Sequence, residues 1–149
     1  MGKLDLAKEN LVLALERLSD AIEHLEKVRA MSAQQVSIVM DKDELERSLR
    51  DSLIQRFEFC IDLFWKLLKK YEEEILNLVP ETDAPRPVIV TACKARIISE
   101  ADAETLLEMI KSRNFTSHIY KEEIADRISS QIPAYYTLMR KYSTVLKSK

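Results

Sequence analysis

One short stretch of this 149-residue chain combines residue types that can do chemistry. It runs from Arg113 to Tyr120, with His118 five positions after the arginine and the tyrosine two further on. Arginine is a permanent planar cation that suits phosphate groups, and histidine is the side chain whose ordinary pKa lies near neutral pH. A tyrosine hydroxyl can act as a nucleophile or be the target of a modification. The functional question therefore concerns this stretch, and the other residues are interpreted as helical scaffold.

The chain has a single glycine, Gly2, and this scarcity excludes several kinds of site. Phosphate-binding loops of the Walker, Rossmann and kinase types need several glycines, because their backbone must approach the phosphate closely. We therefore expect none of these loops and no nucleotide cofactor. Tight β-hairpins also depend on glycine, so the composition disfavours an all-β fold.

Charge and metal-ligand content narrow the possibilities further. The formal net charge is −2, so no overall positive field attracts nucleic acid, although local contacts remain open. With only His24 and His118 as imidazoles, and with Cys60 and Cys93 far apart, we expect no metal site. We interpret the two cysteines as buried free thiols in a reducing cytoplasm. No apolar run is long enough to span a membrane, so the expectation is a cytoplasmic protein.

The spacing of apolar residues predicts an all-α fold. Leucines and isoleucines recur at three- and four-residue steps over residues 4–30, which indicates an amphipathic helix. A second, longer helix is expected over residues 42–78, with Asp41 as its N-cap and Glu44 as the reciprocal partner. Its apolar sector is broad, which predicts a central position. We interpret residues 31–40 as a connection that can include one helical turn.

Three further helices complete the predicted bundle. One spans residues 86–95, one spans residues 100–112 with Ser99 as its cap, and the last begins near Tyr120 and turns Ile124 inward. Pro133 should kink the last helix, because proline removes one backbone hydrogen bond. The prediction is one domain over residues 1–149, an up-and-down helical bundle of about five helices.

Two motifs give the chain a resemblance to a known family. The segment Ile54-Gln55-Arg56-Phe57-Glu58-Phe59, followed by Leu63-Phe64-Trp65-Lys66, resembles the central helix of the nucleotidyltransferase substrate-binding family, which belongs to the HEPN superfamily. The stretch from Arg113 to Tyr120 is similar to the second hallmark of that family, an Arg-x4-His-x-Tyr motif. The apolar residues 36–40 depart from the family pattern and leave the geometry of that connection open.

The resemblance implies a fold, partners and two alternative functions. Members of the family are helical proteins that are usually homodimers, and they are typically encoded beside a minimal nucleotidyltransferase with which they form complexes. Some act as substrate-binding components of the transferase. Some HEPN relatives are metal-independent ribonucleases and toxins of toxin–antitoxin pairs, in which the transferase can adenylylate the motif tyrosine, here Tyr120. Both functions remain open for this chain, and RNA or a nucleotide is the implied ligand.

The residue types themselves are consistent with RNA cleavage without a metal. His118 can exchange a proton with the 2′-hydroxyl or the leaving oxygen, and Arg113 can stabilise the charged phosphorane. The amide of Asn114 can orient either group. A two-fold dimer can bring two such turns together in one composite cleft.

Structural interpretations compete with these functional ones. Arg113 can simply complement a helix dipole, and Tyr120 can be an ordinary surface residue. His24 is interpreted as solvated. Trp65 and the pair Tyr135-Tyr136 fit a core or a dimer interface better than a base-stacking surface. The runs Glu72-Glu73-Glu74 and Lys69-Lys70 are interpreted as a solvated, ion-paired face.

Overall fold

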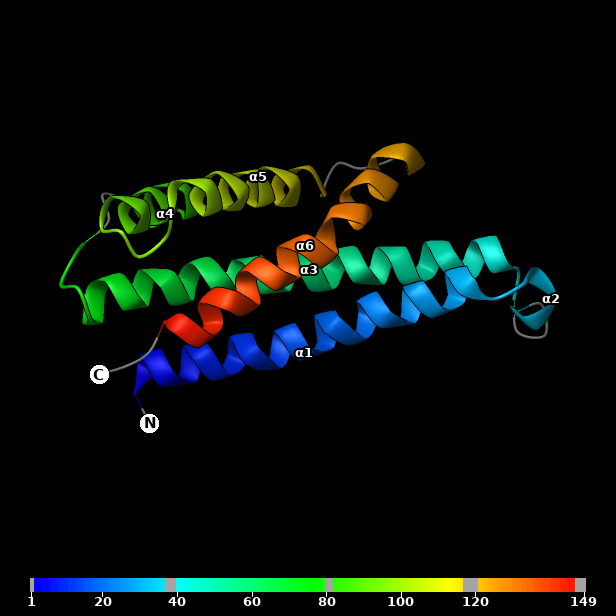
Figure 1. Ribbon diagram of the computed structural model, residues 1–149, viewed down its shortest axis with the longest axis horizontal. Helices are drawn as coiled ribbons and strands as arrows, with labels where there is room; N and C mark the ends of the chain where they lie inside the picture. The colour runs from blue at the N-terminus through cyan, green and yellow to red at the C-terminus, as the bar shows by residue number, and fades with distance from the viewer. Residues whose placement is uncertain (1, 37–39, 80–81, 117–120, 147–149) are drawn as a thin grey trace.

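The computed structural model describes residues 2–36, 40–79, 82–116 and 121–146, and in these ranges it contains helices and no strand (Figure 1). The predicted all-α fold is confirmed. The helices are α1 Lys3–Ala30, α2 Ala33–Val36, α3 Lys42–Glu74, α4 Pro85–Lys94, α5 Glu100–Thr116 and α6 Glu122–Val145. The four-residue α2 is the helical turn that the connection 31–40 allowed.

Helix α3 occupies the centre of the bundle. It packs against α1 along most of its length and also contacts α4, α5 and α6. In Figure 1, α1 and α3 lie side by side, α6 crosses them obliquely, and α4 and α5 lie together along another side of α3. The central position predicted from the broad apolar sector is therefore confirmed.

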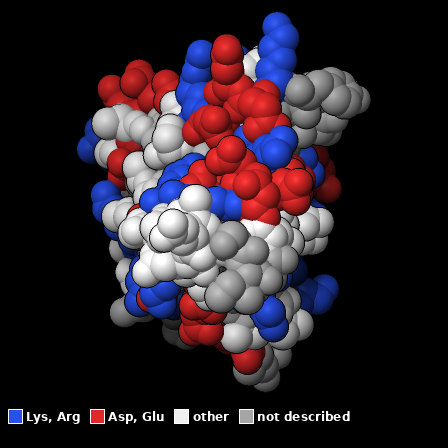
Figure 2. All heavy atoms as spheres, turned by 90° about the vertical axis from the view of Figure 1, so that its right-hand side faces the viewer, with Lys and Arg blue, Asp and Glu red and all other residues white. Residues whose placement is uncertain are grey.

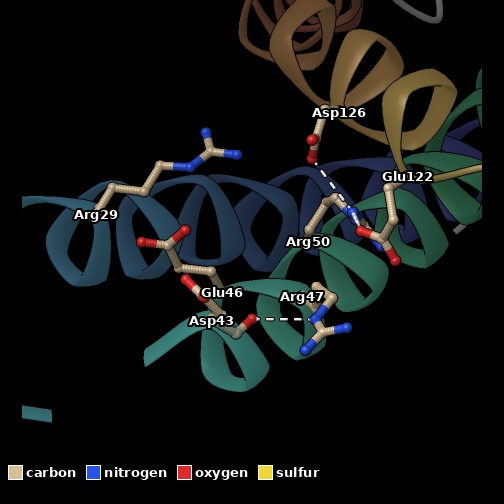
Figure 3. A pocket seen from close by; sticks show the side chains of 7 residues that line it. All are labelled: Arg29, Asp43, Glu46, Arg47, Arg50, Glu122 and Asp126. Carbon is tan, nitrogen blue, oxygen red and sulfur yellow. Dashed lines mark hydrogen bonds and ion pairs between the residues drawn. The ribbon is translucent and has the colours of Figure 1, made fainter. Parts of the chain in front are cut away.

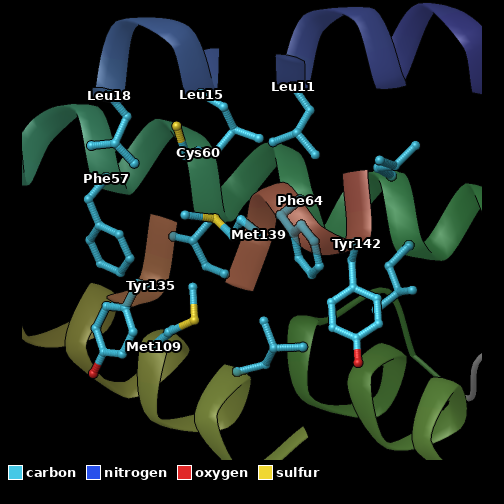
Figure 4. Close-up of a cluster of buried hydrophobic side chains, with 14 of the residues drawn as sticks. Leu11, Leu15, Leu18, Phe57, Cys60, Phe64, Met109, Tyr135, Met139 and Tyr142 are labelled. Carbon is cyan, nitrogen blue, oxygen red and sulfur yellow. The ribbon is translucent and has the colours of Figure 1, made fainter. Parts of the chain in front are cut away.

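The core is built on the middle of α3 (Figure 4). Phe57 and Phe64 of this helix are fully buried, and leucines of α1 pack on one side of them. On another side, the ring of Tyr135 in α6 stacks on Phe57 at 5.5 Å between centroids, and Tyr142 meets Phe64 edge-on at 6.5 Å. These aromatic pairs join α6 to α3, and they confirm the core interpretation of Tyr135.

Helix ends account for most differences from the predicted elements. Asp41 is the N-cap residue of α3, but its side chain forms no capping hydrogen bond, so the predicted reciprocal pair with Glu44 is wrong. Helix α3 ends at Glu74 instead of residue 78, because Asn77 adopts a left-handed conformation with φ of 55°. Helix α5 continues past residue 112 to Thr116, since no proline or glycine interrupts it there.

Of three predicted features of the later helices, one is confirmed, one stays a prediction and one is wrong. The Ser99 hydroxyl accepts a hydrogen bond from the Asp102 backbone N–H at 3.1 Å, as expected of an N-cap. Helix α6 runs through Pro133, whose carbonyl accepts a hydrogen bond from the hydroxyl of Thr137. The kink expected at this proline stays a prediction. Ile124, which was expected to face inward, is instead 37% exposed.

The run of three glutamates at the end of α3 is not the uniformly solvated face that its charge suggested. Lys69 does pair with Glu73 at 3.6 Å, but Glu72 is completely buried and neither of its carboxyl oxygens has a hydrogen-bond partner among the described residues. Burial, reinforced by the neighbouring charge of Glu73, raises the pKa of Glu72 to about 8. The folded protein therefore holds a neutral carboxylic acid at this position near neutral pH.

This buried acid makes stability depend on pH. Because folding raises the pKa of Glu72 from 4.5 to about 8, the folded state binds the proton more tightly than the unfolded state. The contribution of protonated Glu72 to the free energy of unfolding is fully present below pH 4.5 and is lost as the pH rises through 8. We predict that the wild type loses on the order of a few kcal/mol of unfolding free energy between pH 5 and pH 9, and that Glu72→Gln removes most of this loss.

Urea denaturation at the two pH values measures the effect. Glu74→Gln is the matched control, because this glutamate of the same run is exposed and is not among the causes of the raised pKa of Glu72, and it should keep the slope of the wild type. Equal pH slopes for the wild type and Glu72→Gln would contradict the assignment.

Candidate functional site

Arg113 projects from the last turn of α5 onto α3. Its Nε donates a hydrogen bond to Asp62 Oδ1 at 3.4 Å and its Nη2 donates to Asp62 Oδ2 at 3.3 Å. A third contact joins Nη1 to Glu58 Oε2 at 3.5 Å. The hydrogen bond to Asp62 is the main cause that raises the pKa of Arg113, with desolvation acting against it and the charges of both carboxylates adding to the rise. The guanidinium is thus a permanent cation in a defined orientation.

The two carboxylates belong to one face of α3. Glu58 and Asp62 are four residues apart, so they lie one helical turn from each other and form a fork for the guanidinium. The Arg113 side chain keeps 29% of its surface exposed, and solvent therefore screens these contacts. They fix where the cation points more than they stabilise the fold. Asp62 was not among the residues predicted for the site, although its four-residue spacing from Glu58 was a usable signal.

An open pocket of about 310 Å³ lies beside this ion pair. It is lined by Asp62, Trp65, Lys66, Pro85, Ile110, Arg113 and Asn114. The ammonium group of Lys66 lies 5.9 Å from the centre of the Trp65 ring, within the range of a cation–π contact. The pocket therefore combines residues of both sequence motifs. Two cations and an amide beside a hollow form an arrangement that can hold a phosphate group.

The structure places the predicted site residues unequally. Arg113 and Asn114 line one pocket, as their proximity in sequence implied. His118 and Tyr120 lie outside the described residues, so their predicted roles stay predictions. Trp65 is half-buried and packs against the core, in agreement with the structural interpretation of this residue.

A second ion-pair cluster holds the start of α6, directly after the undescribed part of the motif (Figure 3). Arg50 of α3 is 6% exposed and contacts Glu122 and Asp126 of α6 as well as its neighbour Asp51. The Nη1–Oδ1 distance to Asp126 is 3.2 Å. Hydrogen bonding to Glu122 is the main cause that raises the pKa of Arg50. Both flanks of the motif, α5 and α6, are therefore fastened to α3.

The surface around this second cluster carries charges of both signs. Figure 2 shows that end of the molecule, where acidic and basic side chains intermix. A pocket of about 360 Å³ there is lined by Arg29, Asp43, Glu46, Arg47, Arg50, Glu122 and Asp126. Because carboxylates outnumber guanidinium groups in this lining, the pocket is a poor match for a phosphate.

The structure agrees with the interpretation of Cys60 as a buried thiol and differs for Cys93, which is not fully buried. Cys60 is buried and Cys93 is half-buried, and both are free thiols. Burial raises the pKa of the Cys60 thiol to about 12, which makes it unreactive at neutral pH. Within the described residues, no group of three or more potential ligands is placed to hold a metal ion. None of the helices in the described ranges is long and apolar enough to cross a membrane.

Solved structures that share this fold include members of toxin–antitoxin pairs. A Thermus thermophilus protein, ttk003001694, is 27% identical with a TM-score of 0.64, covering 88% of this chain and 99% of that one. A mutant of the toxin–antitoxin pair MntA–HpeT matches with a TM-score of 0.66 at 12% identity, covering 95% of this chain and 99% of that one. A tri-AMPylated Shewanella oneidensis HEPN toxin, solved in complex with its MNT antitoxin, matches with a TM-score of 0.66 at 15% identity over 100% of both chains.

Comparison at the level of sequence gives the family. A search of curated proteins gives no significant match. The family model described as nucleotidyltransferase substrate binding protein like matches residues 13–148, which is nearly the whole chain and includes both motifs. The chain belongs to this family of nucleotidyltransferase substrate-binding proteins and shares its helical fold with HEPN proteins.

Proposed function

We propose that this chain is the partner of a minimal nucleotidyltransferase encoded nearby, as the toxin or the substrate-binding component of such a pair. Membership of the substrate-binding family supports the proposal, as do the pairings of the toxin–antitoxin structures that share the fold. The nucleotide-binding turn of such a transferase has a Gly-Ser pair followed by two aspartates. This chain lacks that pattern, so we infer that it is not itself the transferase.

A second function, ribonuclease activity without a metal, is favoured by the setting of Arg113. Glu58 and Asp62 aim the guanidinium at a pocket that also holds Lys66 and Asn114. An oriented cation with a second cation beside it is what stabilisation of a phosphorane requires. This arrangement is the observation that carries the ribonuclease proposal.

The proposed reaction uses the RNA 2′-hydroxyl as its nucleophile. That oxygen forms a bond to the adjacent phosphorus as His118 removes its proton. The bond from phosphorus to the 5′-oxygen breaks, and this oxygen takes up the proton that His118 has accepted, directly or through water, as it leaves. The products are a 2′,3′-cyclic phosphate and a 5′-hydroxyl end. Arg113 stabilises the extra negative charge on the phosphorane, and the amide of Asn114 orients the reacting groups. DNA lacks the nucleophile and should resist cleavage.

We also propose that the protein is a homodimer whose shared surface includes the neighbourhood of Arg113. Phe59, next to Glu58, is 57% exposed, and Phe115, two residues after Arg113, is 54% exposed. Phe59 belongs to the broad apolar sector of α3, yet the core does not bury it, so its exposure needs another explanation. Large exposed apolar side chains beside a charged site are typical of an interface.

The dimer can be tested by light scattering. The chain mass is 17.3 kDa, and we predict twice this value at micromolar concentration. Phe59→Asp and Phe115→Asp should each shift the mass towards the monomer, because a charge would be buried in the interface. Leu13→Asp is the matched control, since Leu13 of α1 is 53% exposed but lies far along the chain from the motif. A monomeric wild type, or disruption by Leu13→Asp alone, would refute the proposed surface.

The ribonuclease proposal predicts a specific pattern of cleavage. His118→Ala should remove essentially all activity on single-stranded RNA, and Arg113→Ala should lower the rate about 10²- to 10³-fold. EDTA should leave the rate unchanged, because protein groups supply the proton transfers and the stabilising charge. Product ends are identified by mass spectrometry, which should show the cyclic phosphate.

Arg127→Ala serves as the control for the loss of a positive charge. Arg127 is an exposed arginine of α6 that lines none of the pockets described above, so its variant should cleave RNA at the wild-type rate. Full activity in His118→Ala, or strict dependence on magnesium, would exclude this mechanism.

Pairing with the transferase predicts a covalent mark. The Tyr120 hydroxyl would attack the α-phosphorus of ATP, forming a phosphodiester and releasing pyrophosphate. We expect the cognate transferase and ATP to add adenylate mass to this chain, and Tyr120→Phe to prevent it. The bulk and negative charge of the adenylyl group should then inhibit RNA cleavage.

Intact-protein mass spectrometry detects the adduct, and calorimetry detects the complex with the transferase. Tyr136→Phe, which changes a half-buried tyrosine of α6, should accept the same mass as the wild type. An adduct that persists in Tyr120→Phe would contradict the assigned position. A transferase that shows no binding would contradict the partner proposal itself.

A further inference from the structure

A second group of cationic side chains lies on α1 and α3, away from the contacts of Arg113. Its pocket, about 190 Å³ in volume, is lined by Arg17, Asp20, Ala21, His24, Leu49, Ser52 and Arg56. Arg56 precedes Glu58 by two positions, which is roughly 200° around a helix. The two side chains therefore leave α3 on opposite faces, and this α1/α3 pocket is separate from the candidate ribonuclease site.

The arginines of the α1/α3 pocket form no ion pair within the described part of the chain. Arg50 and Arg113 each contact carboxylates, but neither Arg17 nor Arg56 forms an ion pair or hydrogen bond with another described residue. Arg56 is half-buried, and its charge lowers the pKa of the Cys60 thiol against the stronger, opposing effect of burial. A half-buried guanidinium without an anion carries an uncompensated desolvation cost. A bound anion would remove part of that cost.

The lining has the donors and the size for one phosphate group. Arg17 and Arg56 outnumber the single carboxylate, Asp20, so the pocket is positive within a chain of net charge −2. Guanidinium groups match phosphate oxygens in pairs, and the Ser52 hydroxyl adds a further donor. The volume lies below the roughly 300–1,000 Å³ of pockets that enclose whole small molecules. A phosphate fits this space better than a complete nucleotide does.

We propose that the α1/α3 pocket binds a phosphate group, supplied by an RNA backbone or by a nucleotide, with Arg17 and Arg56 as its charged ligands. This site goes beyond the proposed function, because none of its residues belongs to the Arg113 pocket. It also gives Arg56 of the first sequence motif a role on the face of α3 that does not meet α5. Asp20 limits the affinity, since its carboxylate repels the anion.

Titration with inorganic phosphate tests the proposal on the full-length protein. Calorimetry and the arginine Nε–Hε signals in NMR spectra should show saturable binding, with shifts at Arg17 and Arg56. Arg56→Gln should weaken binding about tenfold or more. Asp20→Asn should tighten it about two- to fivefold, because the repelling charge is gone. If Arg56→Gln fails to fold, Arg17→Gln repeats the test, because Arg17 is exposed. Arg127→Gln is the control and should bind phosphate like the wild type.

Two further ligands distinguish the sources of the phosphate. If the pocket serves RNA, Arg17→Gln should weaken binding of a short single-stranded RNA and leave ATP binding unchanged; if it serves a nucleotide, the reverse holds. Arg113→Ala should still bind inorganic phosphate at Arg17 and Arg56, so failure of the ribonuclease proposal would not affect this result. Unsaturable binding, or equal affinities for Arg17→Gln, Asp20→Asn and the wild type, would overturn the proposal.

Discussion

The rest of the structure depends on the requirement that one helix serve several neighbours at once. The middle of α3 is completely buried at Phe57, Ile61 and Phe64, and α3 contacts every other long helix of the bundle. The positions of α3 that lie outside the core carry charged side chains, which form ion pairs with α5 and α6. The apolar side chains determine where those helices lie. The ion pairs determine how charged side chains at the end of α5 and the start of α6 are oriented.

Two arginine clusters involve α3, which supplies the carboxylates in one of them and the guanidinium in the other. At one, Arg113 of α5 reaches carboxylates of α3, and at the other, Arg50 of α3 reaches carboxylates of α6. The segment that carries His118 and Tyr120 connects α5 to α6, so the residues on either side of it are tied to the same rigid element. Arg50 is the more deeply buried of the two, so loss of one of its partners should cost more than loss of a partner of Arg113.

Much of the fold could be predicted because apolar spacing records which face of a helix is buried. The leucines of α1 and the aromatic residues of α3 have the period of a helix, and both helices form where expected. Helix ends were less predictable, because they depend on single backbone conformations. Asn77 and Arg96 adopt positive φ values of 55° and 62° in place of the glycine that usually marks such ends. The burial of Glu72 could not be predicted either, because a charged residue in a run of glutamates is expected at the surface.

The candidate site was predictable only in part, for a related reason. The types and spacing of Arg113, Asn114, His118 and Tyr120 were visible in the sequence, but the partners of Arg113 are 51 and 55 residues earlier in the chain. Tertiary packing alone brings them together. Lys66 and Trp65 joined the site in the same way, because the turn of α3 that carries Asp62 also carries them to the pocket.

The setting of Arg113 also bears on how the proposed site would bind a polyanion in a chain of net charge −2. A partly exposed ion pair contributes on the order of 1 kcal/mol or less, because water screens it. A phosphate can therefore compete with Asp62 and Glu58 for the guanidinium at small cost, whereas a fully buried pair would resist the exchange. The carboxylates hold the cation in place, and in the proposed site weaker anions would have to displace them. In the proposed site, selectivity for phosphate would come from local geometry and from the neighbouring charge of Lys66, and it would need no overall positive charge on the protein.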